Sequence, residues 1–487
     1  MARPLICATV AETRLEALRE ARDAASGAAD LVEVRLDRLE RPEAAGALAG
    51  RRGPVLVTCR PAWEGGGFTG SEAERFGLLE DAVRLGAEYV DVEWRAGERA
   101  RALVERRNGR GVVLSFHDFE GVPGDLEGLA AVMCAGGAEV VKLAVTARRL
   151  GDTLPLLALG RGLGRQHALA LVAMGNAGVA TRILAAHVGS CWTYAGDGVA
   201  PGQIPLRDLL ETYSFRAITP STAIYGILGR PLGHSVSPAM HNAAFRARGL
   251  DAVYVPFEAE GVEDFRLVAL GLDVRGASVT APFKADVVPY LAKADRATRQ
   301  AGAANTIRVR GDDWEGRNTD VEGFLDPLRR RVALGGLRVA LVGAGGAARA
   351  VAAALAGTGA RVTVHARRRD AAAAVAAIAG GRAGDGSPRA GEWDLLVNAT
   401  PVGTHPDSGE LPVDRAALPG GRLVYDLVYN PPVTALRRAA GAAGCATLGG
   451  LDMLVAQAAR QFEWWTGADA PAGLMRAAAE RALLKNE

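Results

Sequence analysis

From the N-terminus to about Tyr213, short apolar runs alternate with stretches of helical periodicity, which include Thr13–Ala25 and Ser71–Leu85. Apolar runs bounded by turn residues predict strands, and apolar positions three and four apart predict amphipathic helices. The expected strands are Leu5–Thr9, Leu31–Arg35, Val55–Cys59, Tyr89–Glu93, Val112–Phe116, Val140–Ala144, Leu169–Ala173 and Ser190–Thr193. Eight such strand–helix units are what a (β/α)8 TIM barrel requires. A doubly wound sheet is the alternative, because a strand count does not prove closure.

Most of these strands carry polar residues at or near their C-terminal ends. The residues are Glu33, Arg35, Thr58, Arg60, Asp91, Glu93, Ser115, His117, Asp118 and Lys142. In a TIM barrel these ends form the active-site face. A single polar strand end is typical of a solvated rim, whereas a succession with both charge signs predicts one convergent site.

Two of these residues have the chemistry of a catalytic pair. Lys142 lies in the apolar stretch Glu139–Val145, where a lysine is costly unless it is paired or deprotonated. A deprotonated amine suits Schiff-base catalysis on a ketone, and an edge-strand lysine that reaches water is the alternative. His117 could serve as a proton shuttle at its strand end, although a structural histidine is the commoner case.

The second half contains a different pattern, a strand that runs into glycines and then a helix. Val339–Val342 is the strand, and Ala350–Ala356 continues an Ala-rich helix. Between them, Gly343, Gly345 and Ala348 fit the pattern G-x-G-x-x-A. The glycines permit the tight turn and the approach of a pyrophosphate, and the helix N-terminus offers N–H groups to the phosphates. The pattern favours a dinucleotide site over an ordinary strand-to-helix turn.

The end of the next strand, Arg361–His365, bears on which dinucleotide binds. An NAD site usually has an acidic residue there to hold the ribose 2′-hydroxyl. This chain has Ala366 followed by Arg367, Arg368 and Arg369. Guanidinium groups suit a 2′-phosphate by charge and by forked geometry, so we expect NADP rather than NAD, with a solvated basic turn as the alternative.

Upstream of the glycines, polar residues follow several expected turns. Ser237 before Pro238 is a good helix N-cap, and Ser235 with Ser237 could instead bind a carboxylate. Lys284 follows an expected strand, and Asp320 could form a proton-transfer pair with it. We expect His234 and His241 to be structural, because no cluster of carboxylates or cysteines accompanies them.

Composition sets outer limits on these assignments. The chain has 487 residues, 49% of them hydrophobic, and a formal charge of +2. This suggests about three soluble domains and gives no reason to expect nucleic acid or a membrane as a partner. The five cysteines are scattered, which favours reduced thiols over zinc. No apolar run predicts a membrane span, and the N-terminus enters a strand without room for a signal or transit peptide, so the cytoplasm is expected.

The first half resembles a known enzyme family. The matching motifs are Glu33–Asp37, Thr58–Arg60 with Glu64–Gly66, Ser115–Phe119, Val141–Lys142, Met174 with Gly178–Arg182, and Ala200–Gln203. In this order they resemble type I 3-dehydroquinate dehydratase. The resemblance implies that Lys142 forms an imine with the substrate ketone and that His117 takes the α-proton and then protonates the departing hydroxyl.

The resemblance also implies roles for further residues of the barrel. Glu64 resembles the carboxylate that orients the histidine. Substrate-binding positions are implied for Glu33, Arg35, Arg60, Arg182 and Gln203, with Arg182 as the candidate for the substrate carboxylate. Two positions depart from the family pattern, since Val199 stands where serine is common and Val172 where methionine is common.

The second half resembles shikimate dehydrogenase along its whole length. The motifs are Ser235–Pro238, Ala277–Lys284, Gly302–Ile307, Gly316–Asp320, the glycine turn, Val397–Gly403, Tyr425–Pro431 and Gly449–Gln457. Lys284 and Asp320 are implied as the catalytic pair. Shikimate-binding positions are implied for Ser235, Ser237, Thr280, Asn305, Tyr429 and Gln457, and NADP(H)-binding positions for Gly343, Gly345, Gly346, Ala347, Arg367, Arg368, Thr400 and Gly450. Ala366 and Arg368 depart from a common Asn-Arg-Thr motif, and Ser278 replaces a common asparagine.

Together the two resemblances imply a bifunctional enzyme that dehydrates 3-dehydroquinate and reduces the product to shikimate, without a metal. The lack of a transit peptide and the Ala/Arg/Gly bias suggest a bacterial cytoplasmic protein. The expected domains are a TIM barrel over 1–215, a linker over 216–222, a substrate domain over 223–325 with 450–487, and a Rossmann-type NADP domain over 334–447. One alternative is a catabolic quinate/shikimate dehydrogenase. Another is a non-catalytic quinate sensor, against which intact Lys142, His117, Lys284 and Asp320 argue.

Overall fold

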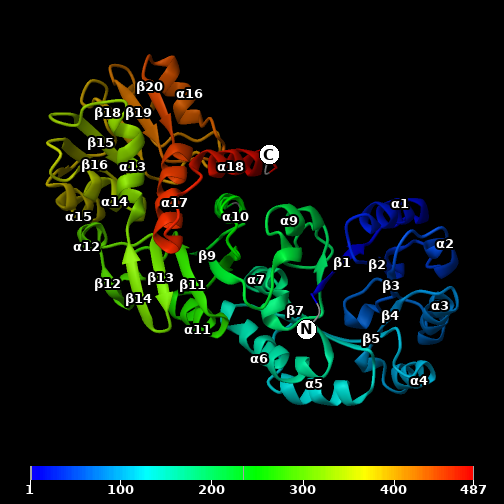
Figure 1. Ribbon diagram of the computed structural model, residues 1–487. Helices are drawn as coiled ribbons and strands as arrows, with labels where there is room; N and C mark the ends of the chain where they lie inside the picture. Colours follow the sequence, from blue (N-terminus) through cyan, green and yellow to red (C-terminus); the bar gives the residue numbers. More distant parts are fainter. Residues whose placement is uncertain (1–2, 234, 486–487) are drawn as a thin grey trace. The chain divides into compact units, whose positions relative to one another are not determined.

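The computed structural model describes residues 3–233 and 235–485. The chain divides into two compact units, one containing the residues up to Thr222 with Val255–Leu272, the other Ala223–Tyr254 with the residues from Asp273 onward. Within the described residues the strands form one sheet of eight and two sheets of six (Figure 1). No described helix is long and apolar enough to cross a membrane.

The sheet of the first unit is a parallel barrel. Its strands are β1 (Leu5–Val10), β2 (Leu31–Arg35), β3 (Val55–Thr58), β4 (Tyr89–Glu93), β5 (Val112–Asp118), β6 (Val140–Thr146), β7 (Ala168–Met174) and β8 (Trp192–Ala195). They follow the order β7-β6-β5-β4-β3-β2-β1-β8, and β8 pairs in parallel with β1. Sequential order with the last strand beside the first excludes a doubly wound sheet, so the TIM-barrel prediction is confirmed.

At the remaining seam, β7 and β8 are joined through a side chain. The Leu171 N–H donates to Ser190 Oγ (2.9 Å), and Ser190 Oγ donates to Trp192 O (2.8 Å). The Cys191 N–H also donates to Leu169 O (2.7 Å). The expected strand Ser190–Thr193 therefore begins two residues too early, because Ser190 bridges the seam with its hydroxyl before the strand starts.

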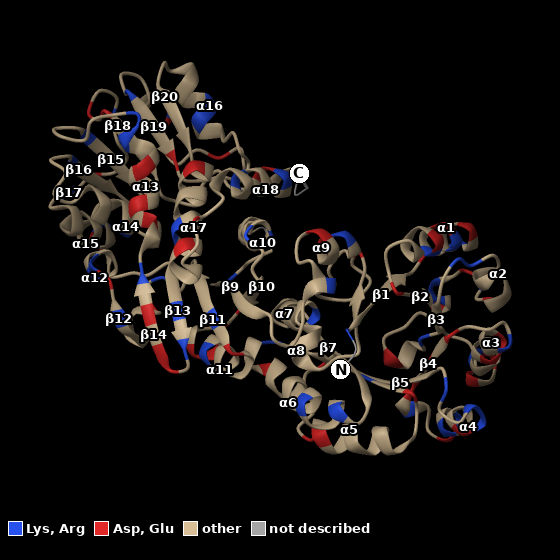
Figure 2. Ribbon diagram, in the orientation of Figure 1, with Lys and Arg blue, Asp and Glu red and all other residues tan. Residues whose placement is uncertain are grey.

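Helices surround this barrel. They are α1 (Leu15–Ser26), α2 (Ala44–Leu48), α3 (Glu72–Arg84), α4 (Glu98–Arg107), α5 (Leu126–Ala135), α6 (Leu154–Gly162), α7 (Val179–Ile183), α8 (Ala185–Val188) and α9 (Leu206–Glu211), and α11 (Val262–Leu272) belongs to the same unit. A capping box starts α3, since Ser71 Oγ accepts from the Glu74 N–H and Glu74 accepts from the Ser71 N–H. Both charge signs lie on α1, α3 and α4 (Figure 2).

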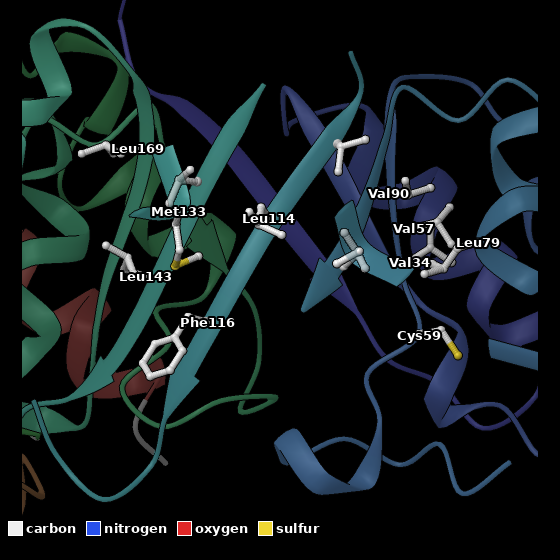
Figure 3. Packing of buried hydrophobic residues seen from close by; sticks show 14 of the residues in the cluster. Val34, Val57, Cys59, Leu79, Val90, Leu114, Phe116, Met133, Leu143 and Leu169 are labelled. Carbon is white, nitrogen blue, oxygen red and sulfur yellow. The ribbon is translucent and has the colours of Figure 1, made fainter. Parts of the chain in front are cut away.

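The barrel strands alternate strictly between two packing environments. Val34, Val57, Val90, Leu114 and Leu143 belong to a large apolar cluster shared with the helices, part of which Figure 3 shows. The strand residues at the alternate positions form a second cluster inside the barrel. Its members are Cys7, Leu31, Leu56, Val113, Val140, Ala144, Ala170, Val172, Met174, Trp192 and Tyr194. Because strand side chains alternate with period two, polar residues two or four positions beyond an interior residue also face inward.

The two six-stranded sheets lie in the second unit, except for Val255–Glu258 of β10, which group with the first unit. One of these sheets has the order β10-β9-β11-β13-β14-β12. Its strands are β9 (Ala223–Gly229), β10 (Ala252–Glu258), β11 (Val274–Val279), β12 (Leu291–Ala294), β13 (Thr306–Arg310) and β14 (Asp313–Arg317). The helices near it in sequence are α10 (Ser237–Ala247), α12 (Arg296–Ala301) and α13 (Thr319–Arg329). The apolar faces of α10 and of the later helices α17 (Gly450–Thr466) and α18 (Ala472–Lys485) meet in one cluster around Phe245, Phe462 and Met475.

The other sheet is fully parallel and has the order β17-β16-β15-β18-β19-β20. Its strands are β15 (Arg338–Val342), β16 (Arg361–His365), β17 (Arg382–Ala383), β18 (Leu395–Asn398), β19 (Leu423–Asp426) and β20 (Ala446–Gly449), and its helices are α14 (Gly346–Leu355), α15 (Arg369–Ala379) and α16 (Ala435–Ala442). This is the Rossmann strand order, in which ligands bind where the order reverses, here between β15 and β18. The predicted Rossmann-type fold is confirmed.

Two glycines in the barrel helices offer a matched test of this packing. A Cβ added to Gly160 of α6 would lie 1.6 Å from Val188 O, whereas a Cβ on Gly77 of α3 would have no neighbour within 4 Å. We expect Gly160→Ala to destabilise the barrel by about 1–3 kcal/mol and Gly77→Ala to stabilise it by about 0.5–1 kcal/mol. Urea unfolding followed by circular dichroism measures both, and a neutral Gly160→Ala would contradict the packing of α6 on α8.

Candidate active sites

Lys142 lies on the inner face of the barrel, at the third position of β6, and is only 5% exposed. Its Nζ donates to Asp91 Oδ2 (3.2 Å) and lies 3.9 Å from Glu33 Oε1. The ring of Tyr194 faces the same nitrogen, 4.3 Å from the ring centroid. A buried ammonium is therefore held by one close carboxylate, a second carboxylate and an aromatic face.

Asp91 is itself held by other charged and polar groups. Arg60 approaches Asp91 Oδ2 with one guanidinium nitrogen at 2.9 Å, and Ser115 Oγ donates to Asp91 Oδ1 (2.5 Å). Burial acts to raise the pKa of Asp91, but Arg60 and Lys142 outweigh it and hold this pKa well below its usual value. Asp91 is thus a permanent anion beside the Lys142 nitrogen.

His117 and Glu64 form the second half of this site. One carboxylate oxygen, Glu64 Oε1, lies 3.0 Å from both the backbone nitrogen and the ring Nδ1 of His117. Burial raises the pKa of Glu64 to about 7. Burial also lowers the pKa of His117 far below its usual value, and the nearby cations Arg60 and Lys142 add to this shift. The contact fixes Nδ1 and leaves Nε2 for a reactant.

The remaining predicted residues of the barrel are placed as follows. Glu33 is buried and accepts from the hydroxyls of Thr9 and Thr58, each at 2.8 Å. Arg35 is turned into a bidentate pair with Asp37, at 2.8 Å for each bond. Gln203 Nε2 lies 3.4 Å from Thr9 Oγ1 and so approaches the Glu33 environment.

Arg182 stands out among the predicted residues because part of its guanidinium is unsatisfied. One terminal nitrogen donates to Pro201 O (3.1 Å), but the buried Nε has no hydrogen-bond partner within the described residues. Burial lowers the pKa of Arg182 to about 10. A buried cation with a free donor is suited to receive an anionic group from a ligand.

Sequence analysis missed the roles of three barrel residues. The sequence marks Asp91 as a polar strand end but not as the partner of Lys142. It marks Thr9 only as the end of the first expected strand and does not single out Tyr194. All three lie at interior parity on their strands, two positions from Tyr89, Trp192 and Cys7. Asp118, by contrast, accepts from the N–H groups of Glu120 and Gly121 and so shapes a turn.

The second unit contains a cleft of about 890 Å³. The predicted residues that line it are Ser235, Ser237, Thr280, Lys284, Asn305, Asp320, Gly345, Gly346, Ala347, Thr400, Tyr429, Gly450 and Gln457. Gly343, Arg367 and Arg368 are not among its lining residues. Arg349 and Gln461, which the sequence did not single out, also line it.

A polar network organises one side of this cleft. Lys284 Nζ donates to Asp320 Oδ2 (2.6 Å), and the Asn305 side-chain amide donates to Asp320 Oδ1 (2.8 Å). The same amide lies 3.1 Å from Gln457 Oε1. Asp320 lies in the first turn of α13 and Gln457 lies in α17, so two helices and the Lys284 segment converge on one ion pair.

The glycine turn lies beside this ion pair. Gly343 has a φ of +117°, and a Cβ there would lie 2.9 Å from Ala399 O. A Cβ at Gly346 would lie 3.0 Å from Lys284 Cδ, so the start of α14 packs on the lysine stem, while Gly345 faces open space. The first N–H groups of the ten-residue helix α14 are available to a ligand, and Arg367 and Arg368 are exposed after β16.

Three local expectations for the second unit compare with the structure as follows. Ser237 is not a helix cap, because α10 already begins at Ser237 and Val236 occupies the cap position. Ser278 accepts from the Tyr254 hydroxyl (2.7 Å) and donates to Gln461 (2.8 Å). His241 is fully buried and stacks on Tyr254, and burial lowers its pKa to about 3.

His234 lies outside the described residues. Among the residues that the structure does describe, no group of three or more His, Cys, Asp and Glu side chains is arranged to hold a metal ion.

Family models match both halves of the chain. A model of type I 3-dehydroquinase matches residues 6–220. A model of the shikimate dehydrogenase substrate binding domain matches residues 227–307, and one of the shikimate 5′-dehydrogenase C-terminal domain matches residues 450–480.

Individual relatives give the same result. The shikimate dehydrogenase (NADP(+)) of Anaeromyxobacter sp. (strain Fw109-5) is 44% identical over 275 residues, which cover 54% of this chain and 97% of that protein. The crystal structure of shikimate 5-dehydrogenase from Thermus thermophilus in complex with NADP(H) and shikimate shares 36% identity and a TM-score of 0.50, over 53% of this chain and 99% of that one. The bifunctional 3-dehydroquinate dehydratase/shikimate dehydrogenase of Arabidopsis thaliana is 34% identical over 502 residues, covering 96% of this chain and 83% of that protein. This likeness runs through both halves, and the chain therefore belongs to the family of bifunctional 3-dehydroquinate dehydratase/shikimate dehydrogenases.

Proposed function

We propose that this chain catalyses two consecutive steps of the shikimate pathway. The barrel dehydrates 3-dehydroquinate to 3-dehydroshikimate, and the second unit reduces that product to shikimate with NADPH. The observation that carries the proposal is the presence of two assembled proton-transfer sites in one chain. His117 with Glu64 lies beside the buried Lys142 in the barrel, and Lys284 with Asp320 lies beside a glycine turn in the cleft.

In the barrel, Lys142 is the nucleophile. Its amine adds to the substrate ketone and forms an imine with loss of water, and the protonated imine withdraws electrons from the adjacent carbon. His117 takes the α-proton through Nε2, while Glu64 stabilises the resulting imidazolium through Nδ1. The same imidazolium then protonates the departing hydroxyl, and hydrolysis of the imine releases the enone. Asp91 stays ionised beside the imine nitrogen throughout.

Substrate binding in the barrel follows from the charges that line it. Arg182, with its unpartnered Nε, receives the substrate carboxylate. Glu33, Arg60 and Gln203 are suited to the ring hydroxyls, because they bring acceptors and donors to the inner face. Arg35, paired with Asp37, contributes charge at the edge of the same site.

In the cleft, Lys284 donates a proton to the ketone oxygen, and Asp320 holds the ammonium in place. Ser235 and Ser237 are suited to the substrate carboxylate, and Thr280, Asn305, Tyr429 and Gln457 to its hydroxyls. NADPH supplies the hydride when it is bound.

The residues around the glycine turn fit this cofactor. Gly345, Gly346, Ala347 and Thr400 line the cleft at the reversal of strand order, where a pyrophosphate can meet the N-terminus of α14. Gly343 provides the tight turn. Gly450 lets the start of α17 lie close to the backbone at Leu427. Arg367 and Arg368 are suited to the 2′-phosphate.

We infer the domain limits from the three sheets: a barrel over 1–215, a linker over 216–222, a substrate domain over 223–325 with 450–487, and an NADP domain over 334–447. We also infer a reducing compartment, the cytoplasm, because all five cysteines are unpaired thiols.

The first prediction separates the two sites. With 3-dehydroquinate and NADPH, Lys142→Ala should abolish NADPH consumption, and added 3-dehydroshikimate should restore it. Lys284→Ala should keep the dehydration and lower the reduction by about 100- to 10,000-fold, since it removes the proton donor. NADPH absorbance and the ultraviolet absorbance of the enone follow the two steps. If the folded wild type turned over neither substrate, the proposal would be refuted and a non-catalytic quinate sensor would be favoured.

The second prediction concerns pH. Ionised Glu64 is needed to hold His117, and its pKa is about 7, so kcat/KM of the dehydration should rise as pH increases through about 7. The inflection should disappear in Glu64→Gln, because the amide does not titrate. Asp118→Asn is the matched control, because the Asp118 carboxylate only accepts hydrogen bonds from the N–H groups of a turn. This variant should keep the inflection. An unchanged profile in Glu64→Gln would refute the role of Glu64.

The third prediction concerns the choice of cofactor. Arg367→Ala and Arg368→Ala should each raise KM for NADPH by about 10- to 100-fold, the value of a charge-assisted hydrogen bond, and leave KM for NADH unchanged. Arg361→Ala is the control, because Arg361 lies at the opposite end of the same strand and binds Gly336 O. Equal effects on NADPH and NADH would contradict recognition of a 2′-phosphate.

A further inference from the structure

Arg75 is a fully buried arginine on α3, a helix on the outside of the barrel. It reaches inward between Trp63 and Phe76, with its guanidinium 4.8 Å from the Phe76 ring centroid. Two of its nitrogens bind Glu72, at 3.0 and 2.6 Å, and the third binds Glu93 Oε2 in β4. Neither family resemblance nor proposed mechanism gives Arg75 a task.

The contact with Glu93 is the first link of a chain of alternating charges. The other oxygen of Glu93 accepts from Arg60 (2.7 Å), and Arg60 contacts Asp91 (2.9 Å). Asp91 in turn contacts Lys142 Nζ (3.2 Å). Arg75 and both carboxylates are fully buried, and Arg60 and Lys142 nearly so. Water therefore screens these interactions little, and each ion depends on its two neighbours.

We propose that Arg75 is a positioning residue for the dehydration: by holding Glu93, it leaves Arg60 free to hold Asp91, and so sets how strongly Asp91 retains the Lys142 ammonium. This inference rests on the proposed dehydratase function. Arg75 does not touch the substrate site, and its effect passes through Glu93, Arg60 and Asp91.

The number of ionic partners that Glu93 and Asp91 keep in each variant sets the expected effect. Without Arg75, Glu93 keeps one cation and draws Arg60 toward itself. Asp91 then has Lys142 as its main cationic partner and holds its Nζ more tightly, which hinders attack on the ketone. With Glu93→Gln, Arg60 turns more fully to Asp91, and Asp91 holds Lys142 less tightly. The two changes should therefore have different effects on kcat of the dehydration.

The other groups around Lys142 keep their own contacts in both variants. Glu33 is held by Thr9 and Thr58, and His117 by Glu64. The remaining groups that face Lys142 electrostatically are Cys7 and Tyr194. None of these hydrogen bonds involves Arg75 or Glu93. The charge of Glu93 does raise the pKa of Glu64, so kcat is compared well above pH 7, where Glu64 is ionised in every variant.

The test uses the full-length protein and its two activities. The variants are Arg75→Met, Glu93→Gln and the control Arg22→Met. Arg22 is an equally buried arginine of α1, held by Asp23 and by the carbonyls of Ala47 and Ala49, with no link to Lys142. Dehydration of 3-dehydroquinate is measured as kcat, KM and kcat/KM against pH. Reduction of 3-dehydroshikimate in the same samples reports that the chain is folded.

In Arg75→Met we expect kcat of the dehydration, compared well above pH 7, to fall by about 10- to 100-fold with little change in KM. Arg75→Lys should restore part of the activity. In Glu93→Gln kcat should not fall, and this variant carries the test even where Arg75→Met does not fold. Arg22→Met should keep the wild-type kcat.

A wild-type kcat in Arg75→Met, or a fall of kcat in Glu93→Gln, would overturn the inference. A wild type without dehydratase activity would instead overturn the proposed function, and the two failures are therefore distinguishable.

Discussion

The constraint on which the barrel depends is the burial of one ammonium group. Lys142, the lysine that we propose forms the imine, is enclosed, and removing one partner of a buried ion pair costs about 3–5 kcal/mol. Lys142 meets this constraint with Asp91, and Asp91 needs Arg60 and Ser115 in turn. The network continues through Glu93 to Arg75 on an outer helix. The single buried charge of Lys142 thus accounts for a polar network that crosses the barrel wall.

The second site also holds a lysine in an ion pair, but this lysine is less deeply buried. Lys284 and Asp320 face a cleft, and the lysine side chain is 17% exposed, so one ion pair with amide support is sufficient. Asn305 and Gln457 hold Asp320 from two different elements. Gly346 packs on the lysine stem, which couples the position of the proposed proton donor to that of the glycine turn. A larger residue at Gly346 would disturb both together.

Much of this organisation is predictable from the sequence because strand periodicity is simple. The apolar runs locate the barrel strands, and interior parity identifies Glu33, Lys142 and His117 as residues of one site. The polar strand ends already include Asp91, and the same parity rule would have added Tyr194. Ser190 and Ser237 show the limit of local patterns, since the first bridges a seam and the second is displaced from a cap by one residue of helix.

Other features lie beyond any local pattern. In the sequence, Arg75 is indistinguishable from any other arginine of an amphipathic helix. Only its contact with Glu93 in the folded protein shows that it belongs to the network. Side chains that act through long-range pairing are set by tertiary geometry, and sequence spacing does not encode it.

The most direct test of the account is chemical identification of the nucleophile. Incubation with 3-dehydroquinate and borohydride should reduce the imine to a stable secondary amine, and peptide mass spectrometry should locate the added mass on Lys142. The account predicts modification of that peptide, with loss of the dehydration and retention of 3-dehydroshikimate reduction. Modification of another lysine, or turnover of the substrate without any trapped adduct, would contradict it.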